Sequence, residues 1–169
     1  MKTTRLKELG LGQTKIADAG MERVAAFKEL QTLDLQDLKV TDSGLGQLKA
    51  LARLQKLNLT HCQIRNLKPL QGLPLVSLNL FGCRMVEDLS PLKGAPLTDL
   101  DLGGTQAADL SPLRGMNLTR LNLSNTPVTD LSPLRGCNDL KSLRLQGTKV
   151  TGAGIAALQK ALPDCKIEQ

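Results

Sequence analysis

The sequence predicts an α/β solenoid of right-handed connection, with a curved parallel β-sheet on the concave face and helices and short 3₁₀ turns on the convex face. Three observations in the 169 residues lead to this fold class. The motif Leu-x-x-Leu-x-Leu occurs seven times, its copies begin 21 to 24 residues apart, and the intervening segments show helical spacing or a proline-containing turn. Repeats of this length build solenoids, because one repeat cannot bury its apolar face without its neighbours.

Each copy of the motif predicts one short strand. The copies begin at residues 6, 30, 54, 75, 97, 118 and 140. Alternation in the Leu-x-Leu part places both leucines on one face of the strand. About 16 residues between strands are enough to bring the chain back so that the next strand is parallel. We therefore expect residues 1–169 to form a single domain, closed by a degenerate eighth motif at residues 162–169 that acts as a cap.

The segments between strands change character along the chain. In the first two repeats they carry apolar residues at helical spacing, which predicts helices of two to three turns: Met21, Val24 and Phe27, then Leu45, Leu48 and Leu51. From the third repeat they shorten and contain a proline, which predicts single 3₁₀ or helical turns: Pro69, Pro91, Pro112 and Pro133. Three serines precede these prolines and are predicted to be helix N-caps: Ser90, Ser111 and Ser132. The last repeat regains a helix.

The motif and its period resemble the leucine-rich repeat family from about residue 6 to the last residue. The 24-residue copies are similar to cysteine-containing and GALA-like bacterial repeats, and the copies that read DLSPL resemble the internalin-like short form. The resemblance implies a non-catalytic domain that binds a protein partner through its concave face. The alternative is a structural or regulatory module of a larger multidomain protein, for example one fused to a kinase or ligase region.

The first repeat raises the question of what covers its edge, because Leu9 and Leu11 lie on the predicted edge strand. Either the chain is the carboxy-terminal part of a longer protein, or Lys2, Arg5 and Lys7 discourage pairing of a bare edge. A monomer is expected, with a dimer through this edge as the alternative. The sequence shows no signal peptide and no membrane-spanning run, so a cytoplasmic location is expected if the chain is complete.

Composition argues against several function classes. The chain has no Trp or Tyr and two Phe, so its core is aliphatic, and aromatic platforms for stacking sugars or single-stranded nucleic acid are missing. The net charge of +6 is moderate, and acidic residues alternate with basic ones, so a nucleic-acid partner is not expected. A basic column of Lys93, Arg114 and Arg135 on the convex side is interpreted as a solvated face.

Neither catalysis nor a metal, cofactor or small-molecule substrate is expected. His61 is the sole histidine, and no nucleophile accompanies it. Cys62 and Cys83 share the ninth repeat position with several threonines and are expected to be reduced core residues that satisfy the turn, although a disulfide between them stays open. A column of acidic and amide residues is expected to accept backbone hydrogen bonds rather than bind calcium: Asp18, Asp42, Asn66, Asp88, Asp109 and Asp130.

The informative surface is formed by the strand residues between the core leucines, because they project from the exposed face of the sheet. Phe81 is the one aromatic residue among them, and such a side chain outside the core is suited to anchor an interface. The amide and acidic side chains supply hydrogen bonds, and the charged ones set complementarity. The predicted partner-binding residues are Lys56, Asn58, Asn79, Phe81, Asp99, Asp101, Arg120, Asn122 and Arg144.

Overall fold

The computed structural model describes residues 5–169, and their strands form one parallel sheet in chain order, β1 to β8. Lys2, one of the residues considered for protecting the first edge, lies outside the described part. Each strand is three residues long, and core leucines stand opposite one another in register, as Leu57 does with Leu78. The strands are Glu8–Gly10, Thr32–Asp34, Lys56–Asn58, Ser77–Asn79, Asp99–Asp101, Arg120–Asn122, Ser142–Arg144 and Lys166–Glu168. The predicted strand in each repeat is confirmed.

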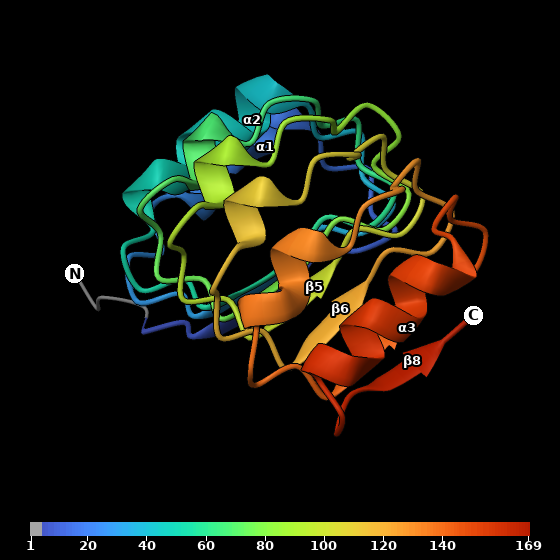
Figure 1. Cartoon of the computed structure of the whole chain (residues 1–169). Helices are drawn as coiled ribbons and strands as arrows, with labels where there is room; N and C mark the ends of the chain where they lie inside the picture. Colours follow the sequence, from blue (N-terminus) through green and yellow to red (C-terminus); the bar gives the residue numbers. More distant parts are fainter. Residues whose placement is uncertain (1–4) are drawn as a thin grey trace.

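Helices cover the other side of the molecule, so the fold is the predicted solenoid, and its two ends carry the two chain termini (Figure 1). The α-helices are α1 (Asp18–Val24), α2 (Asp42–Gln47) and α3 (Gly152–Ala161), which matches the predicted long segments. A 3₁₀ helix, η1 (Leu48–Ala50), continues α2. The short segments form 3₁₀ helices, as predicted: η2 (Lys68–Leu70), η3 (Ser90–Leu92), η4 (Ser111–Leu113) and η5 (Ser132–Gly136).

The core between the two layers is aliphatic and continuous from Met21 to Cys165. Strand leucines and leucines of the returning segments bury almost completely, as Leu100 and Leu113 do. Phe27 is half-buried and packs against this core, as expected, and Leu9 and Leu11 in the first repeat are half-buried against it in the same way. Because each repeat contacts its neighbours rather than distant repeats, the stability of the array depends on these interfaces between repeats.

The chain leaves each of the first seven strands through the same backbone turn. The eighth residue of each of the seven repeats has a positive φ, between 57° and 72°: Gln13, Asp37, His61, Gly82, Gly104, Asn125 and Gly147. Glycine, Asn, Asp and His enter this left-handed region most readily, and they make up six of the seven residues. The turn directs the chain from the concave sheet to the convex side and fixes where the next residue points.

Threonine at the ninth position satisfies this turn with its side chain, as predicted, whereas cysteine at the same position does not close its own turn. The Thr105 hydroxyl donates to the Leu102 carbonyl of its own repeat at 2.7 Å, and Thr126 bonds to Leu123 in the same way at 2.6 Å. The Cys83 thiol instead donates to Leu59 of the preceding repeat at 3.1 Å. The threonines therefore close their own turn, whereas the cysteine links two repeats.

The serine caps predicted for the short helices are wrong. Ser90, Ser111 and Ser132 are the first residues of their 3₁₀ helices and cap nothing with their side chains. The carboxylate two residues earlier takes that role: Asp88 Oδ1 accepts the Ser90 N–H at 2.8 Å, and Asp109 and Asp130 do the same for Ser111 and Ser132 at 2.8 Å. An ionised carboxylate is the stronger acceptor, and the chain path places it within reach of the free N–H.

The same column acts across repeats in the helical part of the chain. Asp18 accepts the Thr41 N–H at 2.8 Å and its hydroxyl at 2.6 Å, and Thr41 is the N-cap of α2. Asp42 accepts the N–H groups of Arg65 and Asn66 at 2.8 and 3.0 Å. The expected backbone hydrogen bonds are thus present, and in these two repeats they join one repeat to the next.

Candidate functional site

The fifth residue of most repeats lies on the concave face but also has a structural task. Asn58, Asn79, Asp101 and Asn122 each accept, through the side-chain oxygen Oδ1, the backbone N–H of the residue two positions later, at 2.8 to 3.0 Å. This N–H follows the last strand residue and has no carbonyl of the sheet as its partner. The four predicted contact residues are therefore held in fixed rotamers, with part of their hydrogen-bonding capacity already used.

The structure brings five of the nine predicted residues together over β5 to β7. They line a shallow hollow of about 190 Å³ on the concave face: Asp99, Asp101, Arg120, Asn122 and Arg144, together with Ser142. The hollow is lined by charged and amide groups from adjacent strands in register. Such a surface can offer both donors and acceptors to a polar ligand segment.

Two pairs of these residues bind one another across neighbouring strands. Arg120 donates from Nε to the Asp99 carboxylate at 3.0 Å and also from Nη2, and these contacts raise the pKa of the guanidinium. Asn122 Nδ2 donates to both carboxylate oxygens of Asp101, at 3.0 and 3.1 Å. Exposed pairs of this kind contribute little to stability, so they can exchange partners at low cost when a ligand arrives.

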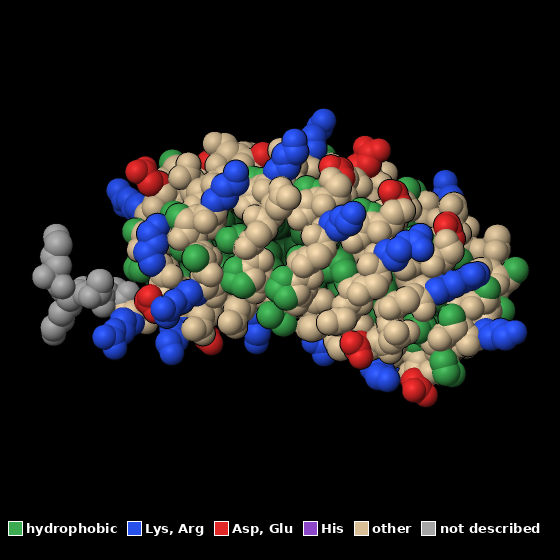
Figure 2. Space-filling view, turned by 60° about the vertical axis from the view of Figure 1, so that its left-hand side comes forward, with side chains coloured by type: hydrophobic (Ala, Val, Ile, Leu, Met, Phe, Trp, Pro, Cys, Tyr) green, Lys and Arg blue, Asp and Glu red, His purple; other side chains and the backbone are tan. Residues whose placement is uncertain are grey.

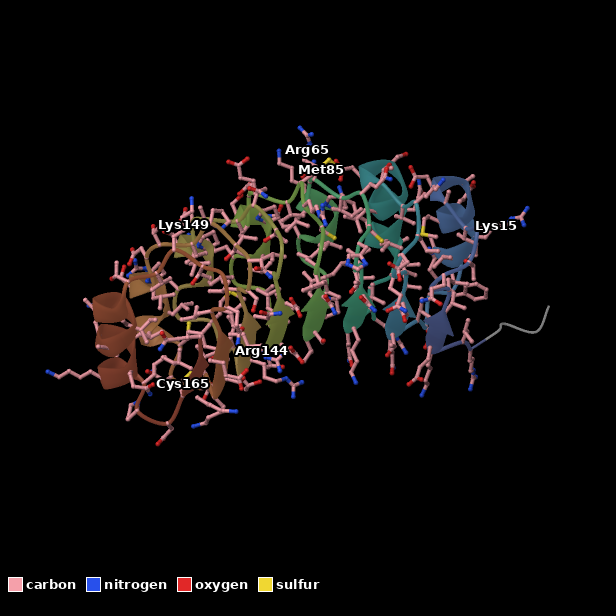
Figure 3. The ribbon with its side chains drawn as sticks, turned by 90° about the vertical axis from the view of Figure 1, so that its right-hand side faces the viewer. Lys15, Arg65, Met85, Arg144, Lys149 and Cys165 are labelled. Atoms are coloured by element: carbon pink, nitrogen blue, oxygen red, sulfur yellow. The ribbon has the colours of Figure 1, made fainter. Side chains whose placement is uncertain are left out.

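Arg144 closes the hollow at its carboxy-terminal end. Its Nε donates to Glu168 on β8 at 3.1 Å, and Lys166 binds the same carboxylate at 2.7 Å. The hydrogen bond and charge of Lys166, with those of Arg144, lower the pKa of Glu168. Arg144 projects from the strand layer in Figure 3, on the opposite side of the molecule from Arg65 and Met85.

The other four predicted residues lie outside this hollow, on β3 and at β4. Lys56 is exposed on β3, and Asn58 and Asn79 are half-buried. Phe81 follows β4 and is 36% exposed. Its ring lies across Gly103 of the next repeat, where a β-carbon on the glycine would come within 2.8 Å of the ring. Gly103 therefore provides the space in which the ring lies.

The sequence predicted a solvent-facing His61, but the structure shows that its ring contacts three neighbouring residues. Its ring packs against Phe81 with a centroid distance of 5.7 Å and a tilt of 60°. Its Nδ1 lies 2.8 Å from Asp37 Oδ1 in the preceding repeat. The ring also occupies the space above Gly82, where a β-carbon would lie 2.1 Å from it. His61 thus holds Phe81 from one side while Gly103 accommodates it from the other.

The cysteines are buried thiols in this structure, which agrees with the core environment expected for them. Burial raises the pKa of Cys62 to about 11 and that of Cys83 to about 12, so both are protonated at neutral pH. A protonated, buried thiol is a poor nucleophile and a poor metal ligand. Within residues 5–169, no three His, Cys, Asp or Glu side chains are grouped as a metal site would require.

The basic column of Lys93, Arg114 and Arg135 is exposed at the ends of the short helices. Hydrogen bonds from Ser132 lower the pKa of Asp130, with a smaller contribution from the charges of Arg135 and Arg114. Figure 2 views the molecule from nearer the left-hand side of Figure 1; Lys and Arg side chains are spread over this face, several of them close together toward its left end, with Asp and Glu side chains among them. On the convex side, the column of aspartates therefore runs beside the column of basic residues. This mixture of charges supports the interpretation of the basic column as a surface that faces solvent.

The sequence interpretation missed Met85, Arg65 and Val76 as surface features. Among the described residues, three large hydrophobic side chains are exposed, and all three belong to the fourth repeat: Val76 at 36%, Phe81 at 36% and Met85 at 41%. Arg65 Nη2 contacts the Met85 sulfur at 3.8 Å. The sequence feature that could have indicated this surface is the length of the fourth repeat, which has 22 residues where the third has 21.

None of the helices in the described part of the chain is both long and apolar enough to cross a membrane. The helices found are amphipathic and cover the sheet.

Comparison with known proteins identifies the architecture. The family model described as "Leucine Rich repeats (2 copies)" matches residues 117–155, whereas no curated protein sequence is significantly similar to the chain. A crystal structure of internalin C2 from Listeria monocytogenes is similar at 29% identity and a TM-score of 0.84, covering 95% of this chain and 69% of that one. The Listeria monocytogenes internalin inlF is similar at 27% identity and a TM-score of 0.84, covering 93% of this chain and 46% of that one.

A leucine-rich repeat protein of Leptospira interrogans shares the fold, with 23% identity, a TM-score of 0.83, and coverage of 97% of this chain and 43% of that one. The chain therefore spans less than half of the inlF and Leptospira chains. Domains with this architecture serve as protein–protein interaction modules and are typically not enzymes. The seven repeats, the eight-stranded solenoid and these likenesses give the chain the leucine-rich repeat fold, in a form similar to that of bacterial proteins.

Proposed function

We propose that the chain binds a protein partner through its concave face, with Phe81 as the apolar anchor. The observation that carries this proposal is the placement of Phe81: a large ring, 36% exposed, held against Gly103 and His61 on a face that is otherwise polar. A ring that is already fixed loses little conformational entropy when it is buried by a partner. Rigid aromatic side chains near the middle of a surface are typical centres of binding energy.

The polar residues would then determine which partner fits. Asn58 and Asn79 lie close to Phe81 along the sheet, and Lys56 adds a positive charge on the neighbouring strand. On the far side, the hollow over β5 to β7 presents its paired charges. The lining residues there are Asp99, Asp101, Arg120, Asn122 and Arg144. Exposed charge pairs contribute more to orientation and association rate than to affinity. Phe81 would therefore supply most of the affinity, and the hollow would orient the partner.

A capture experiment tests this proposal. The full chain is immobilised, lysate from the source organism is passed over it, and captured proteins are compared between wild type, Phe81→Ala and Arg120→Ala. Phe81→Ala is expected to reduce recovery of the specific partner at least tenfold, and Arg120→Ala severalfold. Lys93→Ala, an exposed change on the convex side, serves as the matched control. Equal recovery on wild type and Phe81→Ala, with both proteins folded by circular dichroism, would contradict a binding role for Phe81 on the concave face.

A further inference from the structure

The loop that follows β4 contains one residue more than its counterparts, and that residue is Met85. In the third, fifth and sixth repeats, the buried ninth residue is followed two positions later by a buried apolar residue, as in Cys62 to Ile64 and Thr105 to Ala107. In the fourth repeat, the corresponding residues, Cys83 and Val86, are three positions apart. Since both ends of the loop remain in the core, the additional residue bulges outward, and Met85 is 41% exposed.

The bulge interrupts a line of hydrogen bonds along the edge where the strands end. At this edge, Gln63 donates its N–H to Val40 of the preceding repeat at 3.1 Å, Gln106 to Val86 at 2.8 Å, and Lys149 to Val128 at 3.0 Å. The residue in the same position of the fourth repeat is Arg84, whose N–H bonds to Gly82 in its own turn at 2.9 Å. The third and fourth repeats are therefore not joined here in the way that the second and third, the fourth and fifth, and the sixth and seventh are.

A hollow of about 450 Å³ lies at this interruption. Its lining residues are His61, Cys62, Gln63, Gly82, Arg84 and Met85. Gly82 contributes no side chain, and Met85 supplies a flexible apolar wall that can adapt to an inserted group. His61 lines the hollow and also packs against Phe81, at a centroid distance of 5.7 Å. Through this ring, the hollow is continuous with the apolar anchor on the concave face.

The surroundings of the hollow are positively charged. Arg65 and Arg84 are exposed, and neither forms a salt bridge with any residue in the range 5–169. Nearby carboxylates are engaged, because Asp37 binds His61 and Asp42 accepts two backbone N–H groups. Glu87 adds one exposed carboxylate against the two arginines. Figure 3 shows Arg65 and Met85 next to each other at this edge, with Lys15 and Lys149 toward its two ends.

We propose that the partner-binding surface continues around the strand-exit edge at the fourth repeat, where the hollow beside Met85 takes a bulky apolar side chain of an acidic polypeptide segment. This inference rests on the proposed function, since the segment would belong to the partner that covers Phe81. Met85 and His61 contact the apolar side chain, and Arg65 and Arg84 pair with carboxylates on either side of it. The inserted residue thereby creates a binding position that a 21-residue repeat would lack.

Selection from a phage-displayed library of random 12-residue peptides, with the full chain as the target, tests the inference. Enriched peptides are expected to place Leu, Ile, Met or Phe among Asp and Glu. The best of them, synthesised with a fluorescent label, is expected to bind at least tenfold more weakly to Met85→Ser and to Arg84→Glu. Lys149→Glu introduces the same charge change at the equivalent position of the seventh repeat and is expected to alter binding less than twofold.

A deletion of Met85 makes the test more stringent, because it restores the 21-residue spacing and is expected to abolish binding while the circular dichroism spectrum is kept. If the deletion fails to fold, the Met85→Ser comparison decides. The inference is overturned if no peptide with the expected pattern is enriched, or if Arg84→Glu and Lys149→Glu act equally. Loss of binding in Arg120→Ala with no effect of Met85→Ser would leave the concave-face proposal standing and remove the edge. The opposite result would keep the edge, and the concave face would then stand or fall with the capture experiment on Phe81→Ala.

Discussion

The helical repeats at the start of the chain and the 3₁₀ repeats that follow use the same column of acidic residues in two ways. In the helical part, Asp18 and Asp42 reach forward and bond to the backbone of the next repeat. In the 3₁₀ part, Asp88, Asp109 and Asp130 bond within their own repeat to the start of a short helix. The difference shows that aspartates at one repeat position can bond either to the next repeat or within their own repeat. Which of the two occurs depends on whether the segment after the strand is an α-helix or a 3₁₀ helix.

The α-helical and the 3₁₀ connections are both compatible with one sheet, because each stabilises its own backbone conformation in a different way. A helix such as α1 positions its apolar residues through its own backbone hydrogen bonds. A 3₁₀ turn has fewer of them, and it relies on a proline at its start and a carboxylate that accepts the free N–H. Both kinds of segment place a leucine or methionine in the core, and the strands keep their register across the change from 24- to 21-residue repeats.

The largest effect is expected from removing a core leucine in each part. Leu45 in α2 and Leu113 in η4 are both 0% exposed. Replacement by Ala is expected to lower the free energy of unfolding by about 2–5 kcal/mol at either position. Both substitutions remove the same buried atoms from the core and leave a cavity of similar size. Urea denaturation of the two variants measures this. A cost under about 1 kcal/mol at one position and a full cost at the other would show that only one type of return holds the core.

A proline inside a helix should separate the two parts. Arg23 is exposed in α1, so Arg23→Pro changes the backbone with little change in packing. The loss of the N–H and the clash with the preceding turn are expected to cost about 3 kcal/mol. Arg23→Ala, which keeps the helix, is expected to lie within about 0.5 kcal/mol of wild type. Urea denaturation of both variants provides the measurement. If Arg23→Pro is as stable as Arg23→Ala, the first repeat tolerates the kind of return used by the later ones.

Removing one carboxylate from each part tests the difference in hydrogen bonding directly. Asp18→Ala leaves the partly buried Thr41 N–H and hydroxyl without their acceptor and is expected to cost about 1–3 kcal/mol. Asp109→Ala affects one exposed N–H that water can reach, so a smaller loss is expected. Thermal unfolding of both variants, with hydrogen exchange of the Thr41 amide, provides the measurement. Equal losses would contradict the distinction between linking and closing carboxylates.

The smallest effect is expected from acid titration of the 3₁₀ part. Hydrogen bonds from the serine two residues later lower the pKa of Asp88, Asp109 and Asp130 below the usual value. Their stabilising contribution is therefore complete above about pH 4, the ordinary pKa of an unfolded Asp, and is lost as the pH falls through the lower folded values. The midpoint temperature of wild type should fall more steeply below pH 4 than that of the triple Asp→Asn variant. Parallel curves would show that these carboxylates do not contribute.

The sequence alone predicted the strands, the change from helical to 3₁₀ returns and the burial of the leucines, because these follow from periodicity within one repeat. It also predicted that the acidic column accepts backbone hydrogen bonds. The serine caps were wrong, since both Ser90 and Asp88 stood close enough in the chain to reach the helix start and geometry decided between them.

The surface was harder to predict because it depends on contacts between repeats. The packing of His61 against Phe81 requires the two rings to meet across adjacent strands, and the space above Gly103 is visible only once the sheet is assembled. Met85 was missed for a related reason. Its exposure follows from the anchoring of Cys83 and Val86 on both sides of it, which the repeat length signalled but did not locate. The nine concave residues remain a prediction about binding.

The uniform turn at the eighth residue has a consequence for how such a chain can change over evolutionary time. Because every repeat leaves the sheet with the same backbone conformation and meets its neighbours in register, a unit such as residues 97–117 carries matching surfaces at its front and its back. A gene duplication of that unit would lengthen the concave face by one strand and leave both ends unchanged. The binding surface can therefore lengthen by one whole repeat at a time. A single inserted residue, as at Met85, instead changes the shape of the surface within one repeat.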